Sequence, residues 1–139
     1  MAARLGIKGY AGCFSDDTIP DLDNKEGCVV NLQSAGEPGT HWCAIKRFGK
    51  TIYHFDSLGF PADQPIVEYA DDQDLKIKSK YIRLQQDNSH YCGHYCLLFL
   101  LCVEEPDDIP IFYNQFAISE DDDALKLNDK QIRDIAVEW

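Results

Sequence analysis

The sequence predicts an α+β fold, with a short and mostly antiparallel sheet packed on one helix. The runs 42–48 and 51–56 are predicted as two strands joined by a tight turn at Gly49-Lys50. The apolar run 95–103 is long enough for a buried helix. The 139 residues are 45% hydrophobic and 27% charged, so we expect one soluble globular domain spanning 1–139.

The remaining segments complete this prediction. Alternation and turn signals favour further strands at 28–33, 75–78 and 81–85, and further helices within 62–74 and at 109–117. Residues 5–20 are expected to be irregular. Asn128 looks like the N-cap of a last helix, because Gln131 follows three residues later as in a capping box.

One cysteine, Cys92, comes directly before Gly93 and the apolar run. At the first turn of a helix, a thiol faces unpaired backbone N–H groups and the positive end of the helix dipole. Both favour the thiolate, which is the nucleophile. Gly93 lets a backbone N–H approach a bound carbonyl, as an oxyanion hole requires, and Gln86 could supply a second donor. The alternative is a structural cysteine that begins a core helix.

A cysteine nucleophile needs a base beside the thiol and a third group that orients the base. His41 comes just before the first predicted strand of the hairpin, and Asp56 comes at the end of the second. Because a hairpin brings these two ends together, His41 and Asp56 are expected to be neighbours. Alone, each is an ordinary surface histidine or strand-end aspartate. At matching ends of one hairpin, with a helix-start cysteine downstream, they indicate a catalytic set.

The order His-Trp, strand, turn, strand, Asp and then Gln-x-Asn-x-x-x-Cys-Gly resembles the adenovirus maturation proteases, or adenains. It also resembles the related SUMO and ubiquitin-like-protein proteases. The words VVNLQSAGEPGTHW, FDSLGF and NSHYCGHYCLLFL are more similar to the viral branch. The resemblance implies that Cys92 is the nucleophile, His41 the general base and Asp56 the orienting acid. It implies Gln86 as the oxyanion donor, with Gln85 as the alternative because the spacing in adenain is one residue longer.

The resemblance also implies a substrate class. Both branches cut polypeptides after small residues, typically at Gly-Gly or Gly-X, and the viral enzymes process capsid and core precursors during virion maturation. One alternative is a deubiquitinase or SUMO-protease-like effector that acts on host conjugates, and another is an inactive peptide-binding module. By resemblance, Trp42 lies beside the substrate, and Phe14 with Asp17 fits the spacing of a groove lid. The alternative is that Phe14 is a buried anchor and Asp17 a turn residue.

Charge and composition indicate which partners to expect. The net charge is −11, so a nucleic-acid partner is not expected, although adenain uses DNA as a cofactor. One positive strip is made by Lys76, Lys78, Lys80 and Arg83 and is interpreted as a solvated strand face. Whether a peptide activator is needed is left open.

No metal or other cofactor is expected. His90 and His94 flank Cys92, but no C-x-x-C or H-E-x-x-H word supports a metal site. The other cysteines are predicted to be reduced and mostly packed. The first residues lack the apolar core of a signal peptide, so an intracellular, soluble protein is expected, in host cytoplasm or nucleus and in the virion if viral.

Overall fold

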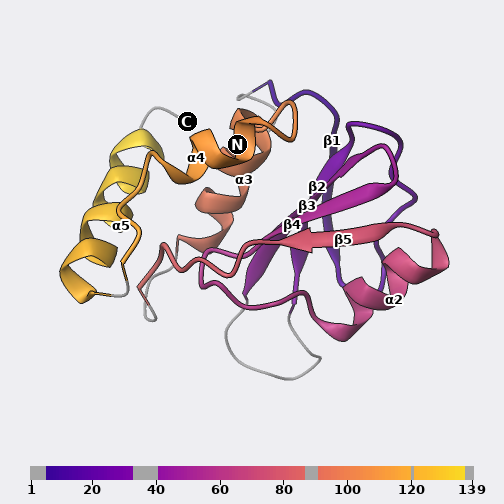
Figure 1. Ribbon diagram of the computed structural model, residues 1–139, viewed down its shortest axis with the longest axis horizontal. Coiled ribbons are helices and arrows are strands. Elements are labelled where there is room, and N and C mark those ends of the chain that lie inside the picture. Colours follow the sequence, from indigo (N-terminus) through magenta and orange to yellow (C-terminus); the bar gives the residue numbers. More distant parts are fainter. Residues whose placement is uncertain (1–5, 33–40, 87–90, 120, 137–139) are drawn as a thin grey trace.

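The computed structural model describes residues 6–32, 41–86, 91–119 and 121–136. Its sheet has five strands in the order β1-β2-β3-β4-β5 (Figure 1). The strands are β1 (Tyr10–Ser15), β2 (Gly27–Asn31), β3 (Trp42–Phe48), β4 (Thr51–Phe55) and β5 (Lys76–Ser79). The predicted β3–β4 hairpin is confirmed, with Phe48 paired to Thr51 across the Gly49-Lys50 turn.

The sheet is mixed rather than mostly antiparallel. β3 pairs antiparallel with both of its neighbours, whereas β1 runs parallel to β2 and β5 parallel to β4. The prediction of an irregular segment at 5–20 was wrong, because β1 lies within it. A register shift between Tyr10 and Gly12, where Gly12 has a φ of 125°, breaks the alternation by which a strand is recognised.

The strand predicted at 81–85 is not formed. β5 ends at Ser79, and the following segment carries no strand pairing among the described residues. The backbone N–H groups of Leu84 and Gln85 both donate to the carbonyl oxygen of Ser57, at 2.8 and 3.1 Å. Since one carbonyl accepts both bonds, the segment is held at a point and not along a ladder.

Helices cover both faces of the sheet. Helix α3 (Cys92–Cys102) packs on the face that presents Val29, Ala44 and Phe55, together with α4 (Asp108–Tyr113). Helix α2 (Gln64–Asp72) covers the opposite face, which belongs to a second apolar cluster. The helix predicted from the apolar run is therefore confirmed. None of the helices in the described ranges has the length and apolar character that crossing a membrane requires.

The last helix, α5, runs from Asp122 to Ala136 and lies at the far end of the molecule from β5 (Figure 1). Asn128 is therefore in the middle of this helix, and its prediction as an N-cap was wrong. The side chain of Asn128 is buried and bonds the backbone N–H and C=O of Ala117 and the carbonyl of Leu84. The Asn128 side chain makes tertiary hydrogen bonds here. A local sequence pattern cannot distinguish an asparagine with this role from one that caps a helix.

Candidate active site

The hairpin brings His41 and Asp56 into direct contact. His41 precedes β3 and Asp56 follows β4, and the antiparallel register places these two ends side by side. The Nε2 atom of His41 lies 2.8 Å from Oδ1 of Asp56. His41 and Asp56 are therefore neighbours, as the hairpin predicts, and a hydrogen bond joins them.

Asp56 is fixed by the turn that follows it. Its side chain is 1% exposed, and Oδ1 also accepts the backbone N–H of Leu58 at 2.8 Å. The N–H of Gly59 donates to the backbone carbonyl of Asp56, and the φ of +79° at Gly59 suits glycine. Among the described residues, Oδ2 of Asp56 has no hydrogen-bond partner. The carboxylate is thus positioned by its turn and aimed at one imidazole.

His41 joins the aspartate to the cysteine. Burial alone would lower the pKa of His41, but hydrogen bonds to Asp56 and Cys92 and the negative charges of both raise this pKa to about 9. Since Nε2 bonds Asp56, Nδ1 is the ring atom left for the thiol. An imidazole held this way can carry a proton between a sulfur atom and a leaving group.

Cys92 is the first residue of α3 and is 7% exposed. The residue before it, Tyr91, provides no side-chain cap to the helix. The sulfur atom therefore lies at the helix end where backbone N–H groups and the dipole favour negative charge. A Cβ atom added to Gly93 would meet no other described residue within 4 Å, so the described part of the chain leaves space beside the second helical residue.

The two adjacent glutamines have different surroundings. Gln86 donates its side-chain amide to Asp122 at 3.1 Å. This hydrogen bond is the largest cause of the lowered pKa of Asp122. Gln85 is 2% exposed, and its Oε1 accepts the hydroxyl of Ser57 at 2.5 Å. Ser57 is the neighbour of Asp56, so Gln85 is the glutamine bonded beside the His41–Asp56 pair.

Two of the expected substrate-side residues, Trp42 and Phe14, lie on the sheet, and Asp17 lies in the turn after β1. Trp42 begins β3 directly after His41 and is partly buried against the α3 side of the core. Phe14, on β1, packs partly buried against the α2-side cluster. Asp17 accepts the hydroxyl of Ser15 at 2.7 Å, in an exposed turn. The described contacts of Phe14 and Asp17 are those of an anchor and a turn.

Two residues of the site were not identified from the sequence. Ser57 is completely buried and bonds Gln85, as described above. Phe60 is 57% exposed, and its ring centre lies 6.4 Å from that of His41 in an edge-on arrangement. Both belong to the sequence FDSLGF, in which Asp56 has the recognisable catalytic residue type, whereas a serine and a phenylalanine give no such signal.

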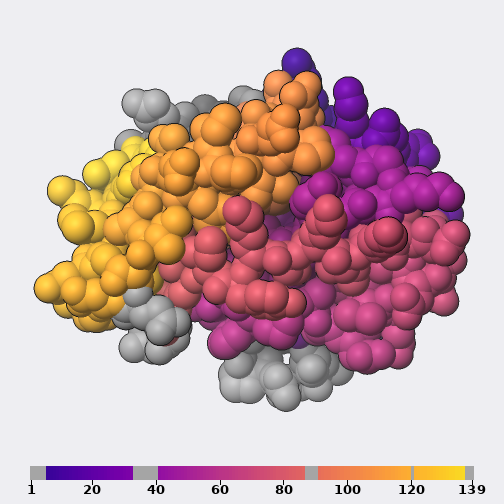
Figure 2. All heavy atoms as spheres, in the orientation of Figure 1, coloured from indigo at the N-terminus to yellow at the C-terminus, as the bar shows by residue number. Residues whose placement is uncertain are grey.

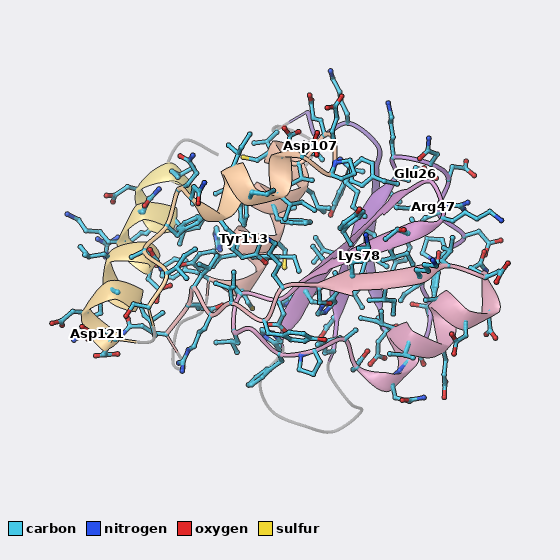
Figure 3. The ribbon with its side chains drawn as sticks, viewed as in Figure 1. Glu26, Arg47, Lys78, Asp107, Tyr113 and Asp121 are labelled. Carbon is cyan, nitrogen blue, oxygen red and sulfur yellow. The ribbon has the colours of Figure 1, made fainter. Side chains whose placement is uncertain are left out.

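A cavity of about 490 Å³ lies elsewhere, between β5 and α4. Figure 2 shows it as a hollow bordered by the salmon β5 segment and the orange α4 segment. Tyr113 from α4 and Lys78 from β5 line it (Figure 3), and the Lys80 ammonium is 5.6 Å from the Tyr113 ring centre. Its lining includes neither His41 nor Cys92, so this cavity is separate from the candidate catalytic set.

The described residues contain no group of three or more metal-ligating side chains. His94 lies against the ring of Tyr91, with centroids 5.5 Å apart, and burial lowers its pKa. His90 falls outside the described residues. All six cysteines are free, as predicted, but Cys13 and Cys102 are exposed rather than packed.

Most of the chain is similar in sequence to a known adenovirus protease. No protein-family model matches the chain. It is 27% identical over 134 residues to a protease of Porcine adenovirus A serotype 3, an alignment that covers 82% of this chain. The chain spans 65% of the length of that curated relative.

Among solved structures, the fold is similar to the crystal structure of the ASFV protease. The TM-score is 0.51 and the sequence identity 24%, over 78% of this chain and 44% of that one. This likeness shows a shared fold of the ubiquitin-like-protease type. The resemblance expected from the sequence is confirmed: this chain is similar to an adenovirus protease.

Proposed function

We propose that this protein is a cysteine endopeptidase with Cys92 as nucleophile, His41 as general base and Asp56 as the residue that orients His41. The observation that carries the proposal is the central position of His41. It bonds Asp56 at 2.8 Å through Nε2 and also interacts with the Cys92 side chain. A nucleophile beside a base that is hydrogen-bonded to an orienting acid is the arrangement that cysteine and serine hydrolases share.

The reaction follows from these contacts. The Cys92 sulfur forms a bond to the scissile carbonyl carbon while its proton resides on His41, which gives a tetrahedral oxyanion. Collapse of this intermediate breaks the carbon–nitrogen bond, and His41 donates the proton to the departing amine. The acyl group is then bound to Cys92 as a thioester. His41 takes a proton from water as the water oxygen bonds the thioester carbon, the carbon–sulfur bond breaks to release the acid product, and His41 returns the proton to the Cys92 sulfur.

The oxyanion needs hydrogen-bond donors, and we assign this role to the backbone N–H of Cys92 and the side chain of Gln85. Gln86 is the residue that the Gln-x-Asn word favours. The side-chain amide of Gln86, however, donates to Asp122 on α5. This contact engages the amide and supports Gln85 as the oxyanion donor. Gln85 is buried beside the Asp56 turn, where a fixed dipole has the most effect on a developing charge.

For substrates, we propose polypeptides cut after small residues of the Gly-Gly or Gly-X type, with viral precursor proteins as the natural targets. The relation to an adenovirus protease supports the viral class. The open space beside Gly93 and the position of Trp42 next to His41 are compatible with a narrow groove. Ubiquitin-like conjugates are the competing substrates to test.

The test is to compare wild type with Cys92→Ala on a peptide library and on ubiquitin-like conjugates. We expect cleavage after small residues by wild type and none by Cys92→Ala, which removes only the nucleophile. Cys102→Ala, a free thiol elsewhere on α3, is the matched control and should cut normally. Equal cleavage by wild type and Cys92→Ala would disprove the proposal, and so would failure of wild type to cut any substrate.

We further propose that DNA does not stimulate this enzyme. The net charge of −11 opposes binding of a polyanion, and the lysines of β5 alternate with Ile77 on a single edge strand. Activity measured with added DNA at low salt, where phosphate contacts are strongest, should stay constant. A large rise that salt abolishes would reveal a basic site in the chain.

A further inference from the structure

We propose that Ser57 is a positioning residue that sets the orientation of the Gln85 carboxamide for oxyanion binding. The inference rests on the proposed function, because it assigns a role only if Gln85 acts on the reacting carbonyl. Ser57 is the residue directly after Asp56 in the chain.

The contact between these two side chains is buried on both sides. Ser57 has no exposed surface and Gln85 is 2% exposed. The Ser57 hydroxyl donates to Oε1 of Gln85 at 2.5 Å. A bond between two polar groups withheld from water is costly to lose, because the partner left behind keeps its desolvation penalty.

This bond determines which end of the amide is used as a donor. A carboxamide has an accepting oxygen and a donating nitrogen at opposite ends, and a rotation of half a turn exchanges them. An oxyanion requires the nitrogen end. By holding Oε1, the Ser57 hydroxyl turns Nε2 away from itself and opposes the rotation that would present the oxygen to a negative charge.

The backbone of Ser57 also helps to fix the position of Gln85. Its carbonyl accepts the N–H groups of Leu84 and Gln85, at 2.8 and 3.1 Å. From the other side, Asn128 of α5 donates to the Leu84 carbonyl at 3.2 Å. The residue that follows Asp56 therefore fixes both the backbone and the side chain of Gln85. It links the position of the oxyanion donor to that of the catalytic acid.

The experiment is a double-mutant cycle with Ser57→Ala, Gln85→Ala and the double variant, assayed on a peptide that wild type cleaves. We expect Ser57→Ala to lower kcat about tenfold to a hundredfold with little change in KM, since the loss concerns the transition state. In the Gln85→Ala background, Ser57→Ala should cause no further loss, because the residue acts through Gln85.

A second readout separates this role from a general structural one. Alkylation of Cys92 by iodoacetamide, followed by mass spectrometry, requires the thiolate but forms no oxyanion. Its rate should be the same in wild type and Ser57→Ala. Ser79→Ala removes another serine hydroxyl, the one 2.9 Å from Nδ1 of His54, and should leave kcat unchanged.

The outcomes are distinct. If wild type cleaves no peptide, both the proposed function and this inference are overturned. If wild type cleaves and Ser57→Ala is equally fast, only the inference falls. It also falls if the two single losses multiply in the double variant, or if Ser57→Ala slows alkylation, because Ser57 would then act through Asp56 and His41. Non-additive loss with unchanged alkylation supports it.

Discussion

Two histidines of the β3–β4 hairpin, His41 and His54, lie near the same carboxylate and have opposite ionisation properties. The pKa of His41 is raised to about 9, whereas that of His54 is lowered to about 4. Burial acts on both in the same direction, toward the neutral ring. The difference is in bonding: His41 shares a hydrogen bond with Asp56, whereas the partner of His54 in the described part of the chain is the neutral hydroxyl of Ser79.

The charge of Asp56 does favour the protonated form of His54, but it does not outweigh the burial of that ring. His54 is 4% exposed, and its Nε2 has no hydrogen-bond partner among the described residues. A nearby carboxylate is therefore insufficient to keep a buried imidazole charged. A direct hydrogen bond to the carboxylate, with the thiol on the other side of the ring, is what distinguishes the catalytic histidine.

The largest expected difference between the two histidines is in turnover. His41→Ala should lower kcat/KM by roughly 10³-fold or more, because it removes the base from a set that acts as a unit. His54→Asn keeps a polar group near Ser79 and should stay close to wild type. Both variants would be assayed on one fluorogenic peptide after circular dichroism confirms folding. If His54→Asn were the weaker enzyme, the assignment of the base would be wrong.

The next effect is that of the orienting acid. Asp56→Asn should lower kcat/KM by roughly 10²-fold, less than loss of the base. It should also lower the pKa of His41 from about 9, since burial then acts with less opposition. The pKa would be read from the His41 ring protons by NMR. Asp63→Asn is the control, because that carboxylate caps α2 and does not bond His41.

These expectations depend on local features that a sequence reveals well. The hairpin turn at Gly49-Lys50 and the helix that begins at Cys92 follow from chain-neighbour patterns. His41, Asp56 and Cys92 occupy the ends of those elements, so their proximity could be predicted.

Other features depend on contacts between distant segments and could not be predicted in the same way. Asn128 has the local pattern of a cap but bonds Ala117 and Leu84 inside the fold. Gln85 and Gln86 are adjacent, and one register step decides which of them is buried. The bond from Ser57 to Gln85 and the bond from Gln86 to Asp122 involve separate segments of the chain, and they distinguish the two glutamines.

A smaller effect concerns stability in acid. The folded protein keeps His54 neutral down to about pH 4, while the unfolded chain binds a proton near the ordinary pKa of about 6.5. His54 therefore reduces stability as the pH falls from 6.5 through 4, by on the order of 3 kcal/mol when complete. His54→Asn should remove this loss.

Urea unfolding of both proteins between pH 4.5 and 7 would measure it. Asp63 titrates in the same range with the opposite sign, because burial and the carboxyl group of Asp16 raise its pKa to about 6. That contribution is common to both proteins and cancels in their difference. Parallel stability curves would show that His54 titrates normally in the folded protein.

The smallest expected effect is that of the thiol on His41. The hydrogen bond to Asp56 contributes more to the raised pKa of His41 than the bond to Cys92 does. Cys92→Ala should therefore lower this pKa from about 9, but by less than Asp56→Asn does.

Because the pKa of His41 is raised in the folded state, its stabilisation is complete below about pH 6.5 and is lost as the pH rises through about 9. Cys92→Ala should move the upper end of that range to lower pH, and His54, whose shift comes first from burial, should keep its own pKa. An NMR titration of the ring protons from pH 4 to 10 reports both histidines in one experiment, with His41 assigned by its absence from His41→Ala. An unchanged His41 midpoint in Cys92→Ala would mean that the imidazole and the thiol are not coupled, and a larger fall than in Asp56→Asn would reverse the order of the two partners.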